Sequence, residues 1–400
     1  MLRNAVHDPR LLPIDPSTPL GGLARLRAMP MADVVVDAVE GRELRVGPHV
    51  LVDFATGAYL GLDRDLRDED VAEARRWGLR NGWSRATGST GLTQALEQEL
   101  AAALGMDAVR LSTSAALLNA SAFHGLRTTR PVAIYDQDVH ITVAQGIRAA
   151  YPSRDRHVFP HADLRALERL LTRLPEGPKV IAVDGIYSMR GSRAPLVELV
   201  ELARAHDALL FVDDVHGFGI TGPNGLGSIE SVPPELRGSC ALLGSFAKAA
   251  SNPVAFLAYP HAEWTGVESA PALVYSGPPS NLHVAVCRRH LAAFPRYASR
   301  RERVRRASLR LHATLADRHV HTASEPGSPV VAVGVQDASA EAVVDHLYAA
   351  GILCKAALYP VVRRGDEVLR FTVTAAHTDA HILRLEEALL PVTPLLRRTR

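Results

Sequence analysis

The sequence has few cysteines and no excess of either charge, and each of these absences excludes a class of protein. Its three cysteines, Cys240, Cys287 and Cys354, lie far apart. An odd and scattered set argues against a disulfide framework or a thiolate metal site, so it predicts a reducing, cytoplasmic compartment and no metal. Lysine and arginine (45) nearly balance aspartate and glutamate (43), and the net charge of +2 therefore predicts neither a nucleic-acid nor a membrane partner.

The sequence also lacks a membrane-spanning or secretory segment. No stretch approaches the ~20 consecutive apolar residues that a membrane span needs. The N-terminal stretch, MLRNAVHDPRLLPIDPSTPL, carries charges and prolines where a signal peptide needs a continuous apolar run. We therefore expect a soluble protein that acts on a small molecule.

What the sequence does have is ample apolar material, 47% of 400 residues, in a regular alternation. Between about Val52 and Pro279, short β-branched runs alternate with amphipathic segments. This pattern predicts an α/β protein whose mainly parallel sheet is covered by helices on both faces. The runs that we expect to be strands are 108–113, 130–136, 178–185, 208–214, 240–245 and 254–260. The segments that we expect to be helices include 93–104, 162–174 and 195–206.

We expect three regions along the chain. Residues 1–50 form an irregular arm with a short hairpin, because Glu40 and Gly41 separate two alternating runs. Residues 51–283 form a large domain that contains the parallel sheet. Residues 284–400 form a small C-terminal α+β domain.

Polar residues stand at the predicted strand ends, where an open α/β sheet binds its ligands. Asp213 ends one apolar run and is followed by His216, and Asp184 ends the run before it. Residues 112–114 are hydroxyl-bearing and open a helical stretch, which favours a phosphate site at a helix N-terminus. Lys248 follows a further run. An amine, a carboxylate and a phosphate site at one sheet edge are what pyridoxal 5'-phosphate requires, because the amine forms a Schiff base and the carboxylate keeps the pyridine nitrogen protonated.

The segment that begins at Asp213, DDVHGFGITGPNGLGS, resembles a motif of a known family. It is similar to the glycine-rich Asp-[Asp/Glu]-Ala-His motif of the α-oxoamine synthases, a family of fold-type I pyridoxal-phosphate enzymes. Other segments match in the family's order: 54–62 (FATGAYLGL), 87–101, 112–120 (STSAALLNA), 136–148 (DQDVHITVAQGIR), 184–196, 244–248 (GSFAK) and 358–382. The resemblance implies a large domain with a seven-stranded, mainly parallel sheet, a small α+β domain, pyridoxal 5'-phosphate as cofactor, and acyltransferase activity.

The resemblance also implies a role for each residue at a matching position. Lys248 would form the Schiff base and move the substrate α-proton, Asp213 would pair with the pyridinium nitrogen, and His216 would hydrogen-bond the phenolic oxygen of the cofactor. His140 would stack on the cofactor ring, and Arg370 would bind the carboxylate of the amino acid bidentately. The remaining predicted residues are Ser188 near the phenolic oxygen and, around the phosphate, Ser245, Ser114, Ala115, Ala116 and, from a second subunit, Ser276.

Several positions depart from the family's pattern on the side that faces the substrate. Gly57 stands where the family usually has an asparagine that helps to hold the substrate carboxylate. The turn 114–116 lacks the family's aromatic residue, and Pro253 lies in a segment where relatives carry several glycines. We therefore expect unchanged cofactor chemistry on an unusual amino acid or acyl donor, in specialised biosynthesis.

The reaction that the resemblance implies is the decarboxylative condensation of an amino acid with an acyl thioester, on coenzyme A or an acyl carrier protein, to an α-aminoketone. The enzyme would be a homodimer with its active sites at the interface. Two alternatives stay open. The first is another reaction on the same cofactor and fold, namely an aldolase, an aminotransferase or carbon–carbon bond formation with a non-thioester partner. The second is a non-catalytic partner subunit, against which Lys248 and Asp213 argue.

Overall fold

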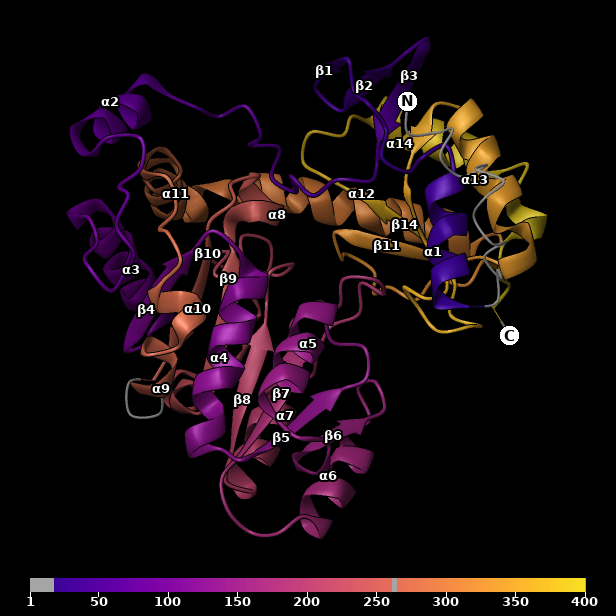
Figure 1. Ribbon diagram of the computed structural model, residues 1–400. Helices are drawn as coiled ribbons and strands as arrows, with labels where there is room; N and C mark the ends of the chain where they lie inside the picture. The colour runs from indigo at the N-terminus through magenta and orange to yellow at the C-terminus, as the bar shows by residue number, and fades with distance from the viewer. Residues whose placement is uncertain (1–17, 261–264, 400) are drawn as a thin grey trace, which may run out of the picture. The chain divides into compact units, whose positions relative to one another are not determined.

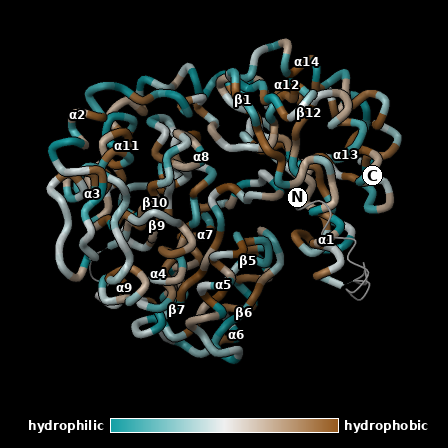
Figure 2. Tube along the Cα trace, turned by 45° about the horizontal axis from the view of Figure 1, so that its top comes forward, coloured by the Kyte–Doolittle hydropathy of each residue, from teal (hydrophilic) through white to brown (hydrophobic). Residues whose placement is uncertain are grey.

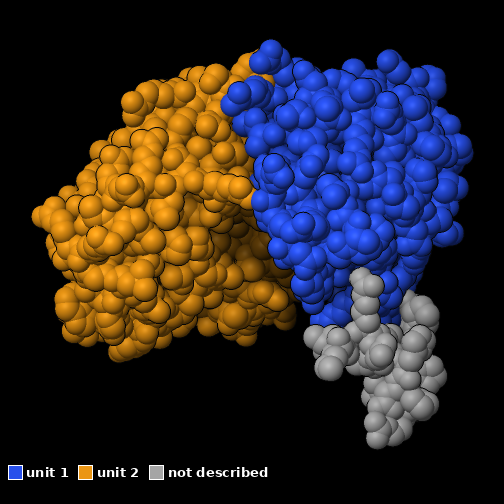
Figure 3. Space-filling model, turned by 90° about the horizontal axis from the view of Figure 1, so that it is seen from above, with its two compact units in different colours: residues 1–56, 189–192, 303–400 blue, residues 57–188, 193–302 orange. Residues whose placement is uncertain are grey.

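The chain folds into two compact units. The computed structural model describes residues 18–260 and 265–399 (Figure 1). Unit 1 comprises residues 1–56, 189–192 and 303–400, and unit 2 comprises residues 57–188 and 193–302 (Figure 3). The first part of the predicted N-terminal arm, residues 1–17, lies outside the described residues. The predicted regions 1–50, 51–283 and 284–400 stay a proposal.

Unit 2 is built on a seven-stranded sheet with the strand order β4-β10-β9-β8-β7-β5-β6. Neighbouring strands run parallel except at β10, which is antiparallel to both β4 and β9. The predicted mainly parallel sheet is thus confirmed. Strand β6 was not among the predicted runs, because it is an edge strand in which Phe159 alone is fully buried. The strands are β4 (Ala108–Ser112), β5 (Val132–Asp136), β6 (Arg156–Phe159), β7 (Lys179–Asp184), β8 (Ala208–Asp213), β9 (Cys240–Ser245) and β10 (Ala255–Tyr259).

Alternate residues of these strands pack under different helices, as the two-residue period of a strand requires. Tyr135 and Phe211 belong to one core cluster with helices α4 and α5, which lie side by side in Figure 1. Ile134 and Leu210 belong to another cluster with α3, α6, α7 and α11. Hydrophobic residues accordingly line the strands labelled β5 and β7 in Figure 2. The helices are α3 (Gly91–Leu104), α4 (Ala115–Thr129), α5 (Ile141–Ala150), α6 (Leu164–Arg173), α7 (Leu196–Ala205) and α11 (Asn281–Ala293).

Capping residues fix where the helices of unit 2 begin. The Thr90 side chain caps α3 by accepting the backbone N–H of Thr93. Helix α5 is capped by a histidine, His140, whose ring accepts the backbone N–H of Thr142. Helices α4 and α5 begin a few residues after β4 and β5, which run in the same direction as β9, so their first turns lie at the carboxyl edge of the sheet. Open α/β sheets bind ligands at this edge.

Unit 1 contains two smaller sheets. The predicted hairpin at Glu40 and Gly41 is present as β1 and β2, and it continues into β3, which pairs in parallel with β12. Strands β11, β14 and β13 form a second, antiparallel sheet. Val52 and Phe371 belong to one core cluster, so N-terminal and C-terminal segments share a core. The elements are α1 (Pro19–Ala28), β1 (Ala38–Glu40), β2 (Glu43–Val46), β3 (His49–Asp53), β11 (Val330–Gly334), α13 (Ala340–Ala349), β12 (Ile352–Leu353), β13 (Lys355–Ala357), β14 (Val368–Thr372) and α14 (Asp379–Leu389).

A proline divides the arginine-rich helical segment that follows residue 280. Helix α11 ends at Ala293, and a 3-10 turn with Pro295 (Phe294–Tyr297) separates it from α12 (Ala298–Ala316), because proline lacks the backbone N–H that a continuous helix needs. None of the helices within residues 18–260 and 265–399 is long and apolar enough to cross a membrane. The remaining helices are α2 (Asp68–Trp77), α8 (Phe246–Ala250), α9 (Thr265–Glu268) and α10 (Pro271–Val274).

Gly125 on α4 packs directly against the backbone of α9. A Cβ at this position would lie 2.3 Å from the nitrogen of Val267 and 2.5 Å from the carbonyl carbon of Gly266. Backbone atoms cannot rotate away, so we expect Gly125→Ala to lower the free energy of unfolding by about 1–3 kcal/mol. Chemical denaturation measures this change. Gly238→Ala is the matched control, because a Cβ there meets nothing within 4 Å, and an unchanged midpoint for Gly125→Ala would contradict the close packing.

Candidate functional site

Two carboxylates lie side by side at the carboxyl edge of the sheet in unit 2. Asp184 ends β7, Asp213 ends β8, and the strand register pairs them directly. Both are buried. Burial raises the pKa of Asp184 well above its ordinary value, and the neighbouring Asp213 raises it further. Burial also raises the pKa of Asp213, so this edge holds negative charge in surroundings that disfavour it.

The Asp213 carboxylate makes two long hydrogen bonds. The side-chain nitrogen of Asn119 on α4 donates to Oδ2 at 3.3 Å, and the backbone nitrogen of Val215 donates to Oδ1 at 3.3 Å. Besides these two bonds, the positive charge that a protonated His140 would carry favours the ionised form and so lowers the pKa of Asp213.

His140 lies at the N-terminus of α5, next to the two carboxylates. Its backbone N–H donates to Asp184, at 3.0 Å from Oδ1 and 3.1 Å from Oδ2. Its ring nitrogen Nδ1 lies 2.7 Å from the hydroxyl oxygen of Thr142 and accepts the backbone N–H of the same residue at 3.3 Å. The backbone of His140 is therefore held by Asp184 and its ring by Thr142.

Lys248 follows β9 by three residues and lies in the short helix α8. Its carbonyl oxygen accepts the backbone N–H of Tyr59 at 2.8 Å. A Cβ on Gly57 would lie 3.1 Å from Cδ of Lys248 and 3.3 Å from its Cα. The segment from Gly57 to Tyr59 thus fixes the lysine backbone and lies close to its side chain, and the glycine leaves that side chain room.

The chain has only three lysines, and the other two lie elsewhere in the fold. Lys179 begins β7, at the opposite end of that strand from Asp184, and its amine donates to the carbonyl of Gly177 at 2.7 Å. Lys355 lies on β13 in unit 1. Lys248 is therefore the lysine that follows the carboxyl end of a strand in unit 2. Because the sequence has only three lysines, it offers few candidates for the Schiff-base lysine.

His216 is buried beside Tyr59, three residues after Asp213. Its Nδ1 lies 2.6 Å from the hydroxyl of Tyr59. Because the backbone of Tyr59 also bonds to Lys248, this tyrosine links two of the residues that the sequence predicts to act on the cofactor.

Apart from Ser276, the predicted phosphate-binding residues lie at two helix N-termini of unit 2. The turn 114–116 opens α4, and its N-cap Ser114 makes no side-chain capping bond. The first-turn N–H groups of an α-helix have no intrahelical acceptor, so they suit an anion. Ser245, the N-cap of α8, accepts from Ala247 at 3.1 Å and donates to the carbonyl of Val254 at 3.2 Å. Since a serine has one hydroxyl proton, Ser245 would have to exchange this bond to donate to a phosphate.

Three further predicted residues lie apart from these elements, and their roles, like those of the other predicted site residues, stay predictions. Ser188 is buried four residues beyond the end of β7. The hydroxyl of Ser276 donates to the carbonyl of Leu273 at 3.1 Å. Arg370 is buried on β14 in unit 1, where the register pairs it with Lys355, whereas the other predicted site residues lie in unit 2.

Asp214, the second aspartate of the motif, holds the glycine-rich loop in place. It accepts the backbone N–H of Ser228 at 2.6 Å and its hydroxyl at 2.7 Å. A Cβ on Gly217 or Gly227 would lie 2.1 Å or 2.2 Å from the Asp214 oxygens, so only glycine fits at these positions. Burial raises the pKa of Asp214 to about 7.

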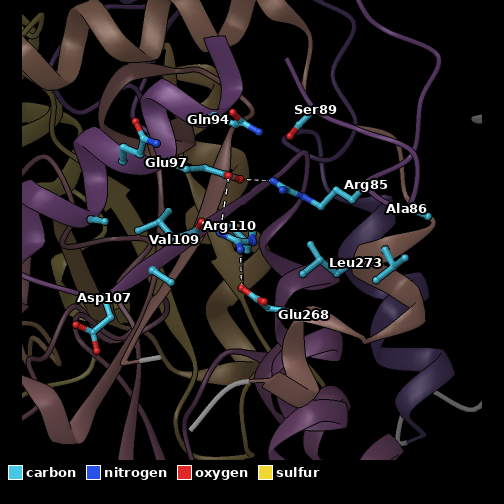
Figure 4. A pocket seen from close by; sticks show the side chains of 14 residues that line it. Arg85, Ala86, Ser89, Gln94, Glu97, Asp107, Val109, Arg110, Glu268 and Leu273 are labelled. Carbon is cyan, nitrogen blue, oxygen red and sulfur yellow. Dashed lines mark hydrogen bonds and ion pairs between the residues drawn. The ribbon is translucent and has the colours of Figure 1, made fainter. Parts of the chain in front are cut away.

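A cavity of about 730 Å³ lies elsewhere in unit 2 (Figure 4). Four of its charged side chains pair with each other: Arg85 with Glu97, and Arg110 with Glu268 at 2.5 Å. None of the predicted site residues lines this cavity. The carboxyl edge of the sheet is therefore the better candidate for the functional site.

Sequence reasoning missed three residues that the structure brings to this edge, Asn119, Thr142 and Tyr59. Each lies inside a segment that resembles the family, but no role was predicted for it. Asn119 had the clearest signal, because a buried polar residue on an otherwise apolar helix face needs hydrogen-bond partners.

The comparisons with known proteins agree with this site. The family model for aminotransferase class I and II matches residues 49–389. A solved structure, the serine palmitoyltransferase of Sphingomonas wittichii, superposes with a TM-score of 0.84 at 23% identity, over 94% of this chain and 98% of that one. This likeness shows the fold, which is the fold-type I fold that the sequence predicted.

Two curated relatives have higher sequence identity. The biotin biosynthesis bifunctional protein BioWF of Cutibacterium acnes is 33% identical over 86% of this chain, and the match spans about half (53%) of that longer protein. The 8-amino-7-oxononanoate synthase of Nitrosococcus oceani is 30% identical over 90% of this chain and 96% of that protein. The chain therefore belongs to the aminotransferase class I and II family, and within it to the α-oxoamine synthases, as its motifs predicted.

The raised pKa of Asp214 makes a prediction for stability. The folded protein binds this proton more tightly than the unfolded chain, where the pKa is ~3.9, so deprotonation between these values favours unfolding. Stability due to this group therefore falls as pH rises from about 4 to about 7. Asp214→Asn removes the titration, and its amide can still accept from the Ser228 backbone and donate to the hydroxyl.

We expect Asp214→Asn to match the wild type near about pH 4 and to exceed its free energy of unfolding at pH 8 by up to about 4 kcal/mol. Urea denaturation across this range measures the difference. The control is Glu235→Gln at an exposed position, and its difference from the wild type in free energy of unfolding should not change with pH. A pH-independent difference, or a less stable Asp214→Asn at pH 8, would show that the Asp214 charge is not disfavoured in the fold.

Proposed function

We propose that this protein is a pyridoxal 5'-phosphate-dependent α-oxoamine synthase that condenses an amino acid with an acyl thioester, with loss of CO2, to an α-aminoketone. The observation that carries this proposal is the buried Asp213 carboxylate, which lies at the same sheet edge as His140, His216 and the lysine-bearing helix α8. The family relationship supports the same chemistry.

The residues at this edge fit the cofactor. The neighbouring carboxylate of Asp136 is satisfied by Tyr187 at 2.9 Å and by the backbone of Ala162 at 2.8 Å. Asp213, in contrast, has two bonds of 3.3 Å, and the side-chain oxygen of the adjacent Asn119 is buried without a partner. A protonated pyridine nitrogen would give Asp213 both a strong donor and a compensating positive charge.

When bound, pyridoxal 5'-phosphate would supply an electron sink that stabilises a carbanion at the α-carbon of the amino acid. Asp213 would hold the proton on the pyridine nitrogen, because a buried carboxylate favours a cationic partner. Lys248 would bind the cofactor through its amine and carry the proton of the substrate α-carbon. The bond between the α-carbon and the acyl carbon forms as the thiolate leaves, the bond to the carboxylate breaks to release CO2, and the α-carbon then takes back the proton that Lys248 carried.

The other predicted residues would orient the reacting groups. His140 would pack against the cofactor ring, and His216, held by Tyr59, would hydrogen-bond the phenolic oxygen. Ser188 would lie near the phenolic oxygen, and the phosphate would lie at the N-terminus of α4 and at Ser245, after Ser245 exchanges its bond to Val254. Arg370 would bind the carboxylate of the amino acid, for which a guanidinium is suited by its two parallel N–H donors.

The proposal also covers the class of substrate and the oligomeric state. Gly57 offers no side chain to the substrate, and the close approach of Lys248 to it leaves no room for one without a shift. We therefore propose an amino acid other than those of the common family members, with coenzyme A or an acyl carrier protein carrying the acyl group. A cytoplasmic homodimer with Ser276 of the second subunit at the phosphate completes the proposal.

The alternative keeps the cofactor and changes the reaction to an aldol, transamination or other carbon–carbon bond-forming step. The observation that favours it is Gly57, because the residue that usually helps to hold the substrate carboxylate is absent.

The reaction is tested by incubating the purified protein, loaded with pyridoxal 5'-phosphate, with a panel of amino acids and acyl thioesters. We expect CO2 and free thiol in equal amounts with at least one pair of substrates, and an absorbance band at about 420 nm from the lysine-bound cofactor. Lys248→Ala should lose the band and both products. Lys179→Arg, which keeps a cation at the other end of the sheet, should retain them.

Two results would overturn the proposal in different ways. Transamination without CO2 and thiol would establish the alternative reaction. A protein that stays colourless after incubation with the cofactor would exclude pyridoxal 5'-phosphate chemistry altogether.

A further inference from the structure

We infer that Asn119 and Thr142 are positioning residues that orient the ring of His140 through a chain of hydrogen bonds from Asp213. This inference rests on the proposed function, because it gives two further residues the task of holding a side chain that faces the cofactor. The four residues come from β8, α4 and the N-terminus of α5, all in unit 2.

When Asp213 is ionised, each bond in this chain has one direction. A carboxylate only accepts, so the amide nitrogen of Asn119 donates to it at 3.3 Å. The same nitrogen donates its second hydrogen to the hydroxyl oxygen of Thr142 at 3.0 Å. The Thr142 hydroxyl is then free to donate its own proton to Nδ1 of His140 at 2.7 Å. Amide, hydroxyl and imidazole thus form one directed series.

The series fixes which ring nitrogen of His140 carries the proton. Nδ1 accepts both the hydroxyl proton of Thr142 and its backbone N–H, the latter at 3.3 Å. The neutral ring therefore carries its hydrogen on Nε2. A proton on Nδ1 would place an N–H against two donors of Thr142, and a flip of the ring would place the Cδ2 hydrogen there, so the series sets the ring orientation as well as the tautomer.

Helices α4 and α5 pack closely against each other beside Asn119. A Cβ on Gly146 of α5 would lie 2.9 Å from the backbone oxygen of Asn119 on α4, so glycine permits this spacing. Asn119 is fully buried, and its side-chain oxygen has no partner. A leucine would fill such a position without leaving a polar atom unsatisfied. The amide at this position uses both of its N–H bonds, one to Asp213 and one to Thr142.

A purely structural role, in which Asn119 and Thr142 only join α4 to α5, makes a different prediction. It would change stability without changing the tautomer of His140. Two variants of Thr142 separate these roles: Thr142→Val keeps the shape and removes the hydroxyl, and Thr142→Ser keeps the hydroxyl and removes the methyl group.

The test uses the full-length protein, labelled with ¹⁵N in histidine and loaded with pyridoxal 5'-phosphate. The signals of His140 are assigned by their loss in His140→Gln. We expect the Nε2–H form in the wild type and in Thr142→Ser, and a mixture of tautomers in Thr142→Val. The dissociation constant of the cofactor, measured from the visible band, should rise about fivefold in Thr142→Val and stay near the wild-type value in Thr142→Ser.

Failure of the positioning role and failure of the proposed function give different results. Unchanged His140 signals in Thr142→Val, or equal effects of valine and serine, would overturn the positioning role. If the wild type binds no cofactor, the proposed function fails. In that case the histidine spectra of the protein without cofactor still decide whether Thr142 sets the tautomer of His140.

Discussion

The structure depends on one buried negative charge, the Asp213 carboxylate at the end of β8. The register of the parallel sheet places it directly beside Asp184, in surroundings that disfavour ionisation of both groups. A fold retains such a pair only if something compensates the charge, because an uncompensated buried carboxylate is costly. The two long hydrogen bonds of Asp213 do not compensate it fully. A cationic ring nitrogen would, and this links the fold to the proposed cofactor.

Hydrogen bonds from several neighbouring elements fix the residues at this edge of the sheet. Asp184 fixes the backbone of His140, Asn119 connects Asp213 to the α5 N-terminus through Thr142, and the segment that contains Tyr59 holds both Lys248 and His216. Asp214 points to Ser228 instead and closes the glycine-rich loop. Adjacent aspartates alternate in direction along a strand end, so one carboxylate serves the candidate site and the next serves the loop.

Much of this arrangement could be predicted from the sequence, for identifiable physical reasons. Apolar runs that end in charged residues predicted the strands β7 and β8 and the position of Asp213, because burial forces such a pattern. The edge strand β6 was missed because only Phe159 of its residues is buried and it carries no apolar run. Asn119 stands out as a polar residue on an apolar helix face, but its link to Thr142 is a contact between α4 and α5, which no local pattern encodes. The bond of Ser245 to Val254 likewise depends on the fold.

The central claim is that Asp213 faces a positively charged ring nitrogen. The most direct test is the ¹⁵N chemical shift of the pyridine nitrogen in labelled pyridoxal 5'-phosphate bound to the protein at pH 8. We expect the shift of a protonated pyridinium, because the buried carboxylate holds the proton. The shift of a neutral pyridine nitrogen would contradict it, since Asp213 would then lack the partner on which the proposed site depends.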